Sequence, residues 1–215
     1  MATRKKQKKT AAEPIPHAAT WAELRRVWAG CKRCKASKGR KLVVFGAGPI
    51  PADIMLIGKS PGRDEDIAGL PVRGVGGQYT YKALLIAGIP WEAVFFDNVL
   101  ACKVASPLKA HIDPCSQRLE DTVAIVRPKL IIGAGAVAAK WLSKTNRSMD
   151  SLSMTRGEWN GIPTFYTVHP MEPVRAGNSG RNPDGYEASM NKIRAEYRSL
   201  GRFARELGIL PPMEE

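Results

Sequence analysis

The feature that most constrains this chain is the placement of its four cysteines. Cys31 and Cys34 form a Cys-x-x-Cys pair near the start, and Cys102 and Cys115 form a second, wider pair. The first residues lack the apolar segment of a secretion signal, so we expect a reducing compartment. Thiols paired in this way favour a four-thiolate metal site over disulfides. Four sulfur ligands suit zinc or an iron–sulfur cluster, which would join the N-terminal segment to the body of the fold.

Length and composition predict a single soluble domain. The 215 residues are 44% hydrophobic, which is enough for one α/β domain with its own core. No apolar run approaches the length of a membrane span. We therefore expect a monomeric protein of the cytoplasm with no membrane partner.

Positive charge is concentrated in two places. The formal net charge is +13, with one basic run at residues 4–9 and a second block at 25–41 that surrounds Cys31 and Cys34. No acidic residue occurs from position 24 to position 52. Such a surface indicates a polyanionic partner, most often nucleic acid, because phosphate contacts release counterions. The alternative is a solubilising tail and a solvated basic face.

Local patterns divide the chain into a tail and one domain. Residues 1–19 read as a disordered basic tail, and residues 20–210 as the domain. Thr20 can cap a first helix, with Glu23 at the capping-box position. Buried strands are expected at 53–58, 94–100, 128–135 and 164–168; helices are expected at 78–88, 116–126, 136–143 and 186–207, with a glycine-rich loop at 176–185. This alternation predicts an α/β fold with a mostly parallel sheet between two helical layers.

Polar residues follow the ends of three of these strands. The segment Gly58-Lys59-Ser60-Pro61-Gly62 follows the first strand, Asn98 lies late in the second, and His169 follows the last. Ligands of such sheets bind beyond the carboxyl ends of the strands, so we expect these residues to share one cleft. The glycine segment has the character of an anion-binding loop but lacks the spacing of a Walker loop, and an ordinary Gly/Pro turn is the alternative.

Each candidate side chain has a chemical and a structural interpretation. Glu65 and Asp66 can orient a water or stabilise a developing cation, or they can complement a helix N-terminus. The amide of Asn98 suits the edge of a pyrimidine, or is a satisfied strand-end amide. His169 can donate a hydrogen bond to an oxyanion as a neutral imidazole, or be structural.

Taken together, these segments resemble the family 4 uracil-DNA glycosylases, the iron–sulfur branch of the uracil-DNA glycosylase superfamily. The resemblance covers residues 21 to 200 and rests on the order of its parts. These are the Cys-x-x-Cys pair, the glycine segment with its extension through Gly77, the strand 97–101 before Cys102, Cys115, and His169-Pro170. Each part alone is weak evidence for this family, but the parts in this order are together specific for it.

The resemblance implies a three-layer α/β/α sandwich with a four-stranded sheet and a nucleotide flipped out of DNA. It implies a [4Fe-4S] cluster, with zinc as the alternative metal. Asn98 would read the base edge, and His169 would donate to the uracil O2. The residues at the base and sugar would be Gly58, Ser60, Pro61, Gly62 and Val72. The DNA contacts would be Arg175 and Met171, with Met171 acting as a wedge together with Val174. The cluster ligands would be Cys31, Cys34, Cys102 and Cys115.

The chain departs from the family pattern at several positions. Lys59 replaces a glutamate that is thought to position the attacking water, and a cation there would repel an oxocarbenium-like sugar. Val72 replaces a phenylalanine that would stack on the base, a contact worth about 1–3 kcal/mol. Residues 103–105 replace an Arg-Pro-Pro segment, and Cys102 and Cys115 are closer together than in the family.

Three functional interpretations therefore remain. The first is a uracil-DNA glycosylase in which Glu65 or Asp66 assumes the role of the missing glutamate. The second is an enzyme acting on another base, with Lys59 as a nucleophile or as a contact to the base or a phosphate. The third is a protein that binds DNA without excision and in which the metal site is purely structural.

Overall fold

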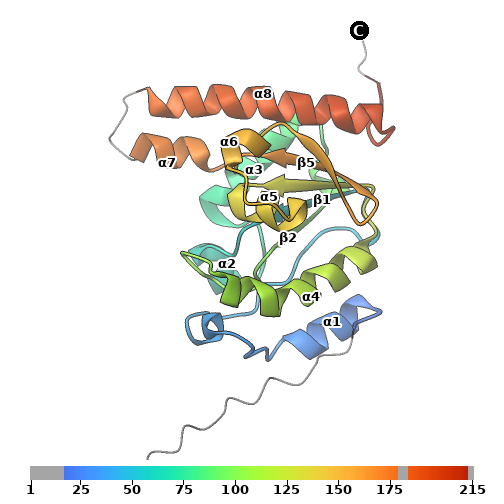
Figure 1. Ribbon diagram of the computed structural model, residues 1–215, viewed down its shortest axis with the longest axis vertical. Coiled ribbons are helices and arrows are strands. Elements are labelled where there is room, and N and C mark those ends of the chain that lie inside the picture. Colours follow the sequence, from blue (N-terminus) through green and yellow to red (C-terminus); the bar gives the residue numbers. More distant parts are fainter. Residues whose placement is uncertain (1–16, 179–183, 213–215) are drawn as a thin grey trace, which may run out of the picture.

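The computed structural model describes residues 17–178 and 184–212 as a central sheet between two layers of helices (Figure 1). The basic run at 4–9, with most of the expected tail, lies outside the described residues. Helices α3 and α8 cover one face of the sheet, and α4 and α5 cover the other. Helix α1 packs outside α4 (Figure 1). The predicted three-layer α/β architecture is confirmed.

The sheet has five strands, one more than expected. Its order is β2-β1-β3-β5-β4, and the first four strands are mutually parallel. The strands are β1 (Ile54–Gly58), β2 (Val94–Asn98), β3 (Leu130–Ala134), β4 (Arg156–Trp159) and β5 (Ile162–Thr167). The additional strand β4 pairs antiparallel with β5 at the edge. Its sequence Arg-Gly-Glu-Trp is mostly exposed, so it lacks the apolar run by which the other strands were predicted.

Alternate residues of the central strands build two separate cores. Ile54 and Leu56 of β1 belong to the core beneath α3 and α8, whereas Met55 and Ile57 belong to the core beneath α4 and α5. This is the two-residue period of a strand with both faces covered. Because every residue of β1 is buried, its register against β2 and β3 is tightly specified, and so is the position of the loop that follows it.

All the expected helices are present, although those expected at 78–88 and 116–126 begin earlier, and three short helices within the described residues, at 63–68, 149–152 and 172–178, are additional. The helices are α1 (Trp21–Trp28), α2 (Arg63–Ala68), α3 (Gly74–Ala87), α4 (Lys109–Val126), α5 (Ala136–Ser143), α6 (Met149–Leu152), α7 (Glu172–Asn178) and α8 (Gly185–Glu206); short 3-10 turns occur at Lys35–Lys38 and Trp91–Ala93. Helix α4 starts seven residues before the expected helix, so it includes Cys115. Helix α7 occupies the start of the expected loop at 176–185, of which residues 179–183 lie outside the described part.

The first helix closes a small third core. Thr20 caps α1 and Glu23 completes the capping box, as predicted. Leu24 and Trp28 are buried together with Phe45. Ala18, which we assigned to the tail, is also buried there, and its N–H donates to Asp121 Oδ2 of α4 at 3.2 Å. The segment that carries the first cysteine pair is thereby fixed against α4. Across the described residues, no helix is both long and apolar enough to cross a membrane.

Candidate active site and four-cysteine site

Two of the expected site residues meet at the ends of β1 and β2. Gly58 and Asn98 are direct partners in the parallel register, and the N–H of Val99 donates to the carbonyl of Gly58 at 2.9 Å. A Cβ atom placed on Gly58 would lie 2.5 Å from Oδ1 of Asn98. The amide of Asn98 therefore occupies the space that a side chain at position 58 would need.

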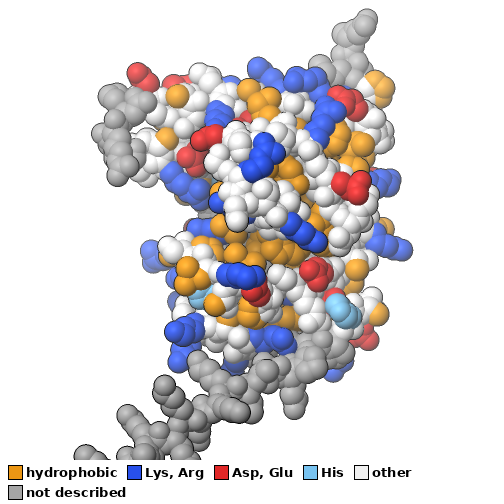
Figure 2. Space-filling view, in the orientation of Figure 1, with side chains coloured by type: hydrophobic (Ala, Val, Ile, Leu, Met, Phe, Trp, Pro, Cys, Tyr) orange, Lys and Arg blue, Asp and Glu red, His pale blue; other side chains and the backbone are white. Residues whose placement is uncertain are grey.

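The remaining strands bring His169 and Met171 to the same edge. A Cβ atom on Gly135, at the end of β3, would lie 3.2 Å from the Cβ of His169. One on Gly76, in the first turn of α3, would lie 3.8 Å from Cγ of Met171. The surface is hollowed between α7 and the region of α2, and Lys and Arg side chains stand on both sides of this hollow (Figure 2).

His169 is set up as a neutral hydrogen-bond donor. Its Nδ1 accepts the N–H of Met171 at 3.1 Å, which assigns the ring proton to Nε2. Burial, followed by the nearby charges of Arg175 and Lys59, lowers the pKa of His169 to about 4. At neutral pH the ring therefore carries no charge and presents one N–H group.

The glycine segment is tied to the loop that follows Cys102. Lys59 Nζ donates to the carbonyl of Ala105 at 3.0 Å, and Ser60 Oγ donates to the carbonyl of Val104 at 3.1 Å. The carbonyl of Lys59 accepts the N–H of Leu100 at 3.1 Å. Burial, and then the charge of Arg175, lower the pKa of Lys59. Pro61 is buried and Gly62 is exposed, so the segment crosses from the core to the surface.

The two carboxylates near this loop bind backbone groups. Glu65 Oε2 accepts the N–H of Gly62 at 2.6 Å. Burial raises the pKa of Glu65, although the backbone of Gly62, Val72 and Arg73 favours the ionised form. Asp66 is only 2% exposed, and its Oδ1 accepts the N–H groups of residues 41 and 42 at 2.9 and 3.4 Å. Lys103 Nζ lies 3.9 Å from the second oxygen of Asp66.

Val72 and Arg175 occupy the periphery of the site. Val72 has a φ of 52°, which is rare for a β-branched residue. A Cβ atom at position 77 would collide with the carbonyl of Val72, and Gly77 avoids this collision because it has none. Val72 lines a groove with Trp91 and Phe96, and Asn98 and His169 are absent from the described lining of that groove. Arg175 is exposed on α7, with a nitrogen 3.8 Å from Glu172 Oε2.

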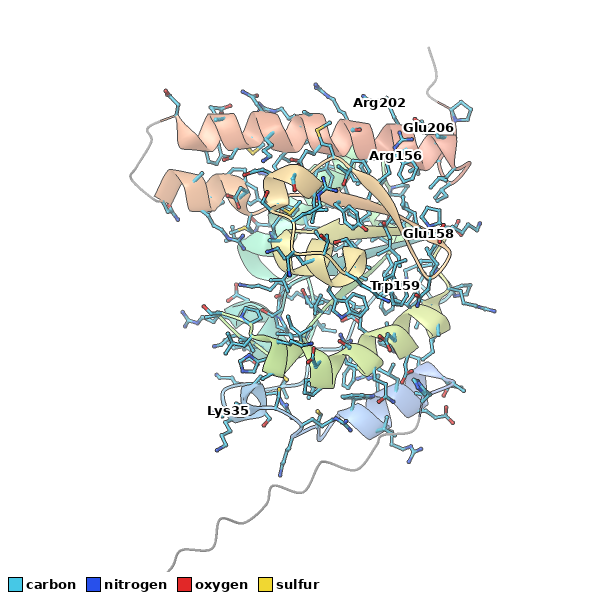
Figure 3. The ribbon with its side chains drawn as sticks, in the orientation of Figure 1. Lys35, Arg156, Glu158, Trp159, Arg202 and Glu206 are labelled. Atoms are coloured by element: carbon cyan, nitrogen blue, oxygen red, sulfur yellow. The ribbon has the colours of Figure 1, made fainter. Side chains whose placement is uncertain are left out.

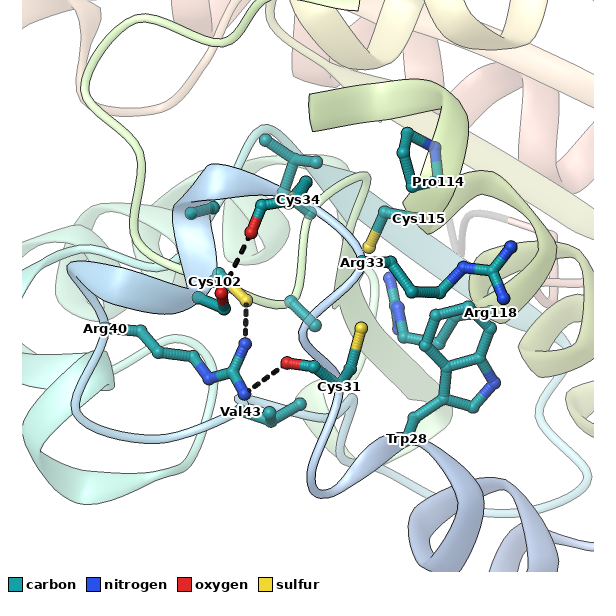
Figure 4. A pocket seen from close by; sticks show the side chains of 14 residues that line it. Trp28, Cys31, Arg33, Cys34, Arg40, Val43, Cys102, Pro114, Cys115 and Arg118 are labelled. Carbon is teal, nitrogen blue, oxygen red and sulfur yellow. Dashed lines mark hydrogen bonds between the residues drawn. The ribbon is translucent and has the colours of Figure 1, made fainter. Parts of the chain in front are cut away.

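All four cysteines line one cavity between α1, α4 and the loop after β2 (Figure 4). Arg40 Nη1 donates to Cys102 Sγ at 3.1 Å, and Arg40 Nη2 donates to the carbonyl of Cys31 at 2.6 Å. Burial raises the pKa values of the Cys31 and Cys102 thiols, whereas Arg40 favours the thiolate of Cys102. Four cysteines from three separate segments thus line the same cavity.

A set of four thiolates suits zinc or an iron–sulfur cluster. Tetrahedral zinc, with bonds of about 2.3 Å, requires its sulfur ligands within about 4 Å of one another. Within the described residues, no three His, Cys, Asp or Glu side chains are grouped closely enough to hold one ion. In an iron–sulfur cluster each metal atom takes a different thiolate, and the four cysteines that line this cavity are the residues that would supply them.

Our sequence reasoning missed Arg118, which lies between the two sites. Its side chain is fully buried; Nη1 donates to Asp97 Oδ2 at 2.7 Å, and Nη2 donates to the carbonyl of Asn98 at 2.5 Å. Burial alone would lower the pKa of Arg118, but Asp97 and Cys115 raise it, so the guanidinium stays charged. The sequence does contain a signal for such a residue, namely Asp97 inside an apolar strand. A buried carboxylate requires a partner, so a buried basic residue could have been expected.

Comparison with known proteins decides the family. The model of the uracil DNA glycosylase superfamily matches residues 45–194. A type-4 uracil-DNA glycosylase of Saccharolobus solfataricus is 36% identical over 152 residues, covering 65% of this chain and 70% of that protein. The type-4 protein of Sulfurisphaera tokodaii is 32% identical over 194 residues, covering 84% of this chain and 81% of that protein. The chain belongs to the type-4 uracil-DNA glycosylases.

Membership of this family confirms the resemblance drawn from the cysteines and the strand ends. The relatives are named as uracil-DNA glycosylases, so this chain is an enzyme of the glycosylase class, a hydrolase. The roles of the individual residues remain predictions, as does the metal that the cysteines hold.

We predict that Gly58→Ala disables this type-4 glycosylase without unfolding it. The added methyl group would displace the amide of Asn98, which is the flexible end of a side chain and moves at small cost in stability. We expect base release to fall roughly tenfold or more, the effect of one lost hydrogen bond to substrate. Gly39→Ala is the control, because a Cβ at Gly39 meets nothing within 4 Å. An unchanged rate in folded Gly58→Ala would contradict the assigned position of Asn98.

We predict that the His169 ring titrates near pH 4 in the folded protein. Because this pKa is below the unfolded value of 6.5, the unfolded chain binds a proton between these pH values that the folded chain does not. The contribution of His169 to stability is therefore full above pH 6.5 and is lost as the pH falls toward 4. NMR titration of the imidazole Cε1–H, assigned with His169→Gln, measures the pKa; a midpoint near 6.5 would contradict the neutral-donor role.

Proposed function

We propose that this protein releases uracil from DNA by hydrolysing the N-glycosidic bond of a nucleotide rotated out of the base stack. The observation that carries the proposal is that the Asn98 amide and a neutral His169 N–H lie at the same edge of the sheet, at the ends of its parallel strands. Extrusion of the base costs a few kcal/mol and exposes its hydrogen-bonding edge to these groups.

Asn98 would select the base by its pattern of donors and acceptors. Uracil presents an N3–H donor beside the O4 acceptor, which the carbonyl and amino groups of one amide can match. Cytosine presents an N4 amino donor at the position of O4, so it would leave the amide mismatched. A buried, unmatched polar pair costs about 1–3 kcal/mol, enough for substantial discrimination.

His169 would stabilise the departing base. Negative charge builds on uracil O2 as the glycosidic bond breaks, and a donor fixed in advance at that atom stabilises the transition state more than the ground state. A neutral imidazole suits this role because its Nε2–H is present across the physiological pH range. The N–H of Met171 fixes the tautomer, so the donor needs no rearrangement.

Glu65, Asp66 and Lys59 would hold the loops of the site in place and would take no part in the bond-breaking step. Glu65 and Asp66 bind backbone groups, so we assign them to holding the glycine segment and the loop at 41–42. The ionised Glu65 would also favour a developing positive charge on the sugar. Lys59 binds the carbonyl of Ala105 and is assigned to fixing the loop after Cys102, not to nucleophilic attack.

DNA would lie along the hollow between α7 and α2 (Figure 2). Arg175 is exposed on α7, its charge acts on His169 and Lys59, and it is suited to a phosphate contact. Met171 is half-buried against the start of α3 and would enter the gap left by the flipped base. Val72 would contribute less to base stacking than an aromatic residue would, since it packs toward Trp91.

The four cysteines would hold a [4Fe-4S] cluster, with zinc as the alternative. Cys31 and Cys34 would bind it from the segment after α1, Cys102 from the loop after β2, and Cys115 from α4. When bound, the cluster would supply a covalent cross-link between these three segments. Arg40 would stabilise the negative charge of the thiolates through its hydrogen bond to Cys102.

The direct test is base release from an oligonucleotide with one uracil, read as alkali-sensitive strand cleavage by anaerobically purified protein. We expect cleavage at uracil and none at cytosine or thymine. Asn98→Ala should lose cleavage but keep its affinity for uracil-free DNA, because the amide contacts only the flipped base. Asn191→Ala, on the exposed surface of α8, is the control.

Other outcomes separate the competing interpretations. Intact DNA binding without cleavage would refute uracil release and favour another base or a binding-only role. A covalent product trapped by borohydride and abolished by Lys59→Arg would instead make Lys59 a nucleophile. Equal loss of cleavage and of DNA affinity in Asn98→Ala would contradict a base-reading role.

Loss of one thiol should remove the metal. We predict that Cys102→Ala retains little iron and melts at a lower temperature, because the N-terminal segment loses its link to the loop after β2. Iron content and visible absorbance measure the first effect, and circular dichroism the second. Ser37→Ala, which lines the same cavity and keeps all four thiols, is the control. Full iron content in Cys102→Ala would refute the ligand assignment.

A further inference from the structure

Both backbone polar groups of Asn98 are held by one buried ion pair. The carbonyl of Asn98 accepts Arg118 Nη2 at 2.5 Å, and its N–H donates to Asp97 Oδ1 at 2.7 Å. The second oxygen of Asp97 accepts Arg118 Nη1 at 2.7 Å. The backbone of Asn98 is thus fixed on both sides, and only the rotation of its side chain remains free.

The same guanidinium reaches the cysteine cavity. Arg118 follows Cys115 by one turn of α4, interacts with its side chain, and lines the cavity with all four cysteines (Figure 4). The fully buried guanidinium of Arg118 therefore binds the end of the base-reading strand, and the same residue lines the cavity of the proposed cluster ligands.

Burying the ion pair of Arg118 and Asp97 in the core is unfavourable in free energy. Removing a guanidinium and a carboxylate from water carries a desolvation penalty that often equals or exceeds their attraction. The Nε of Arg118 has no hydrogen-bond partner among the described residues, so the pair is not fully compensated. Apolar side chains of similar volume would fill the same space without this penalty, which favours a role in fixing geometry.

We infer that Arg118, together with Asp97, is a positioning residue for base recognition, which sets the orientation of Asn98 from the side of the four-cysteine site. The inference rests on the proposed role of Asn98 in reading uracil. Arg118 does not touch the base; it acts by holding the backbone from which the reading amide projects.

The test compares Arg118→Met with the unmodified protein, using the binding of free uracil, measured by titration calorimetry, as the probe of the base pocket. We expect the dissociation constant of free uracil to rise roughly tenfold, as for one misplaced hydrogen bond, with unchanged affinity for uracil-free DNA. Arg118→Lys, which keeps the charge but not the two-pronged geometry, should recover part of the loss. Iron content should stay full, because all four thiols remain. Where Arg118→Met fails to fold, Asp97→Asn, of nearly equal volume, takes its place.

Matched variants separate the possible failures. Arg156→Met breaks the Arg156–Glu206 pair, of 2.6 Å, which joins β4 to the end of α8 away from the site (Figure 3). This control variant should bind free uracil as the unmodified protein does. If Asn98→Ala leaves the binding of free uracil unchanged, the proposed function has failed. If Asn98→Ala weakens the binding of uracil but folded Arg118→Met does not, or if Arg118→Met loses its iron as well, the positioning inference is overturned.

Discussion

The buried ion pair between Arg118 and Asp97 is the interaction on which the organisation of the site depends. It joins α4 to the end of β2, and it is the physical connection between the cysteine cavity and the residue proposed to read the base. A pair with both side chains fully buried is strongly destabilising to break, because either partner alone is left as an uncompensated charge. Helix and strand are therefore fixed relative to each other in one arrangement.

The rest of the site follows from the parallel sheet. Four parallel strands end at the same edge, so Gly58, Asn98 and His169, which are far apart in the sequence, are brought to that edge by the pairing of the strands. Burial then adjusts the chemistry, since it keeps His169 neutral and leaves its single N–H as a donor. A rigid edge with a fixed neutral donor suits a reaction in which the leaving group gains negative charge.

Features encoded locally were predictable from the sequence, and features that depend on distant partners were not. The capping of α1 by Thr20 and Glu23, the buried run of β1 and the alternation of strands and helices all follow from neighbouring residues. Strand β4 was missed because it exists through its pairing with β5. Arg118 was missed because its partner is 21 positions away. Motif order did indicate the family, since the cysteines and strand ends keep their sequence whatever contacts surround them.

The most direct test of this account is native-state hydrogen exchange at the backbone N–H of Asn98 in the unmodified, metal-loaded protein. If the ion pair fixes the end of β2, this N–H should exchange only through large-scale unfolding, as slowly as the central amides of β2 such as that of Phe96. Exchange at the rate of an exposed turn would contradict the account, because the reading amide would then project from a strand end that the ion pair does not hold.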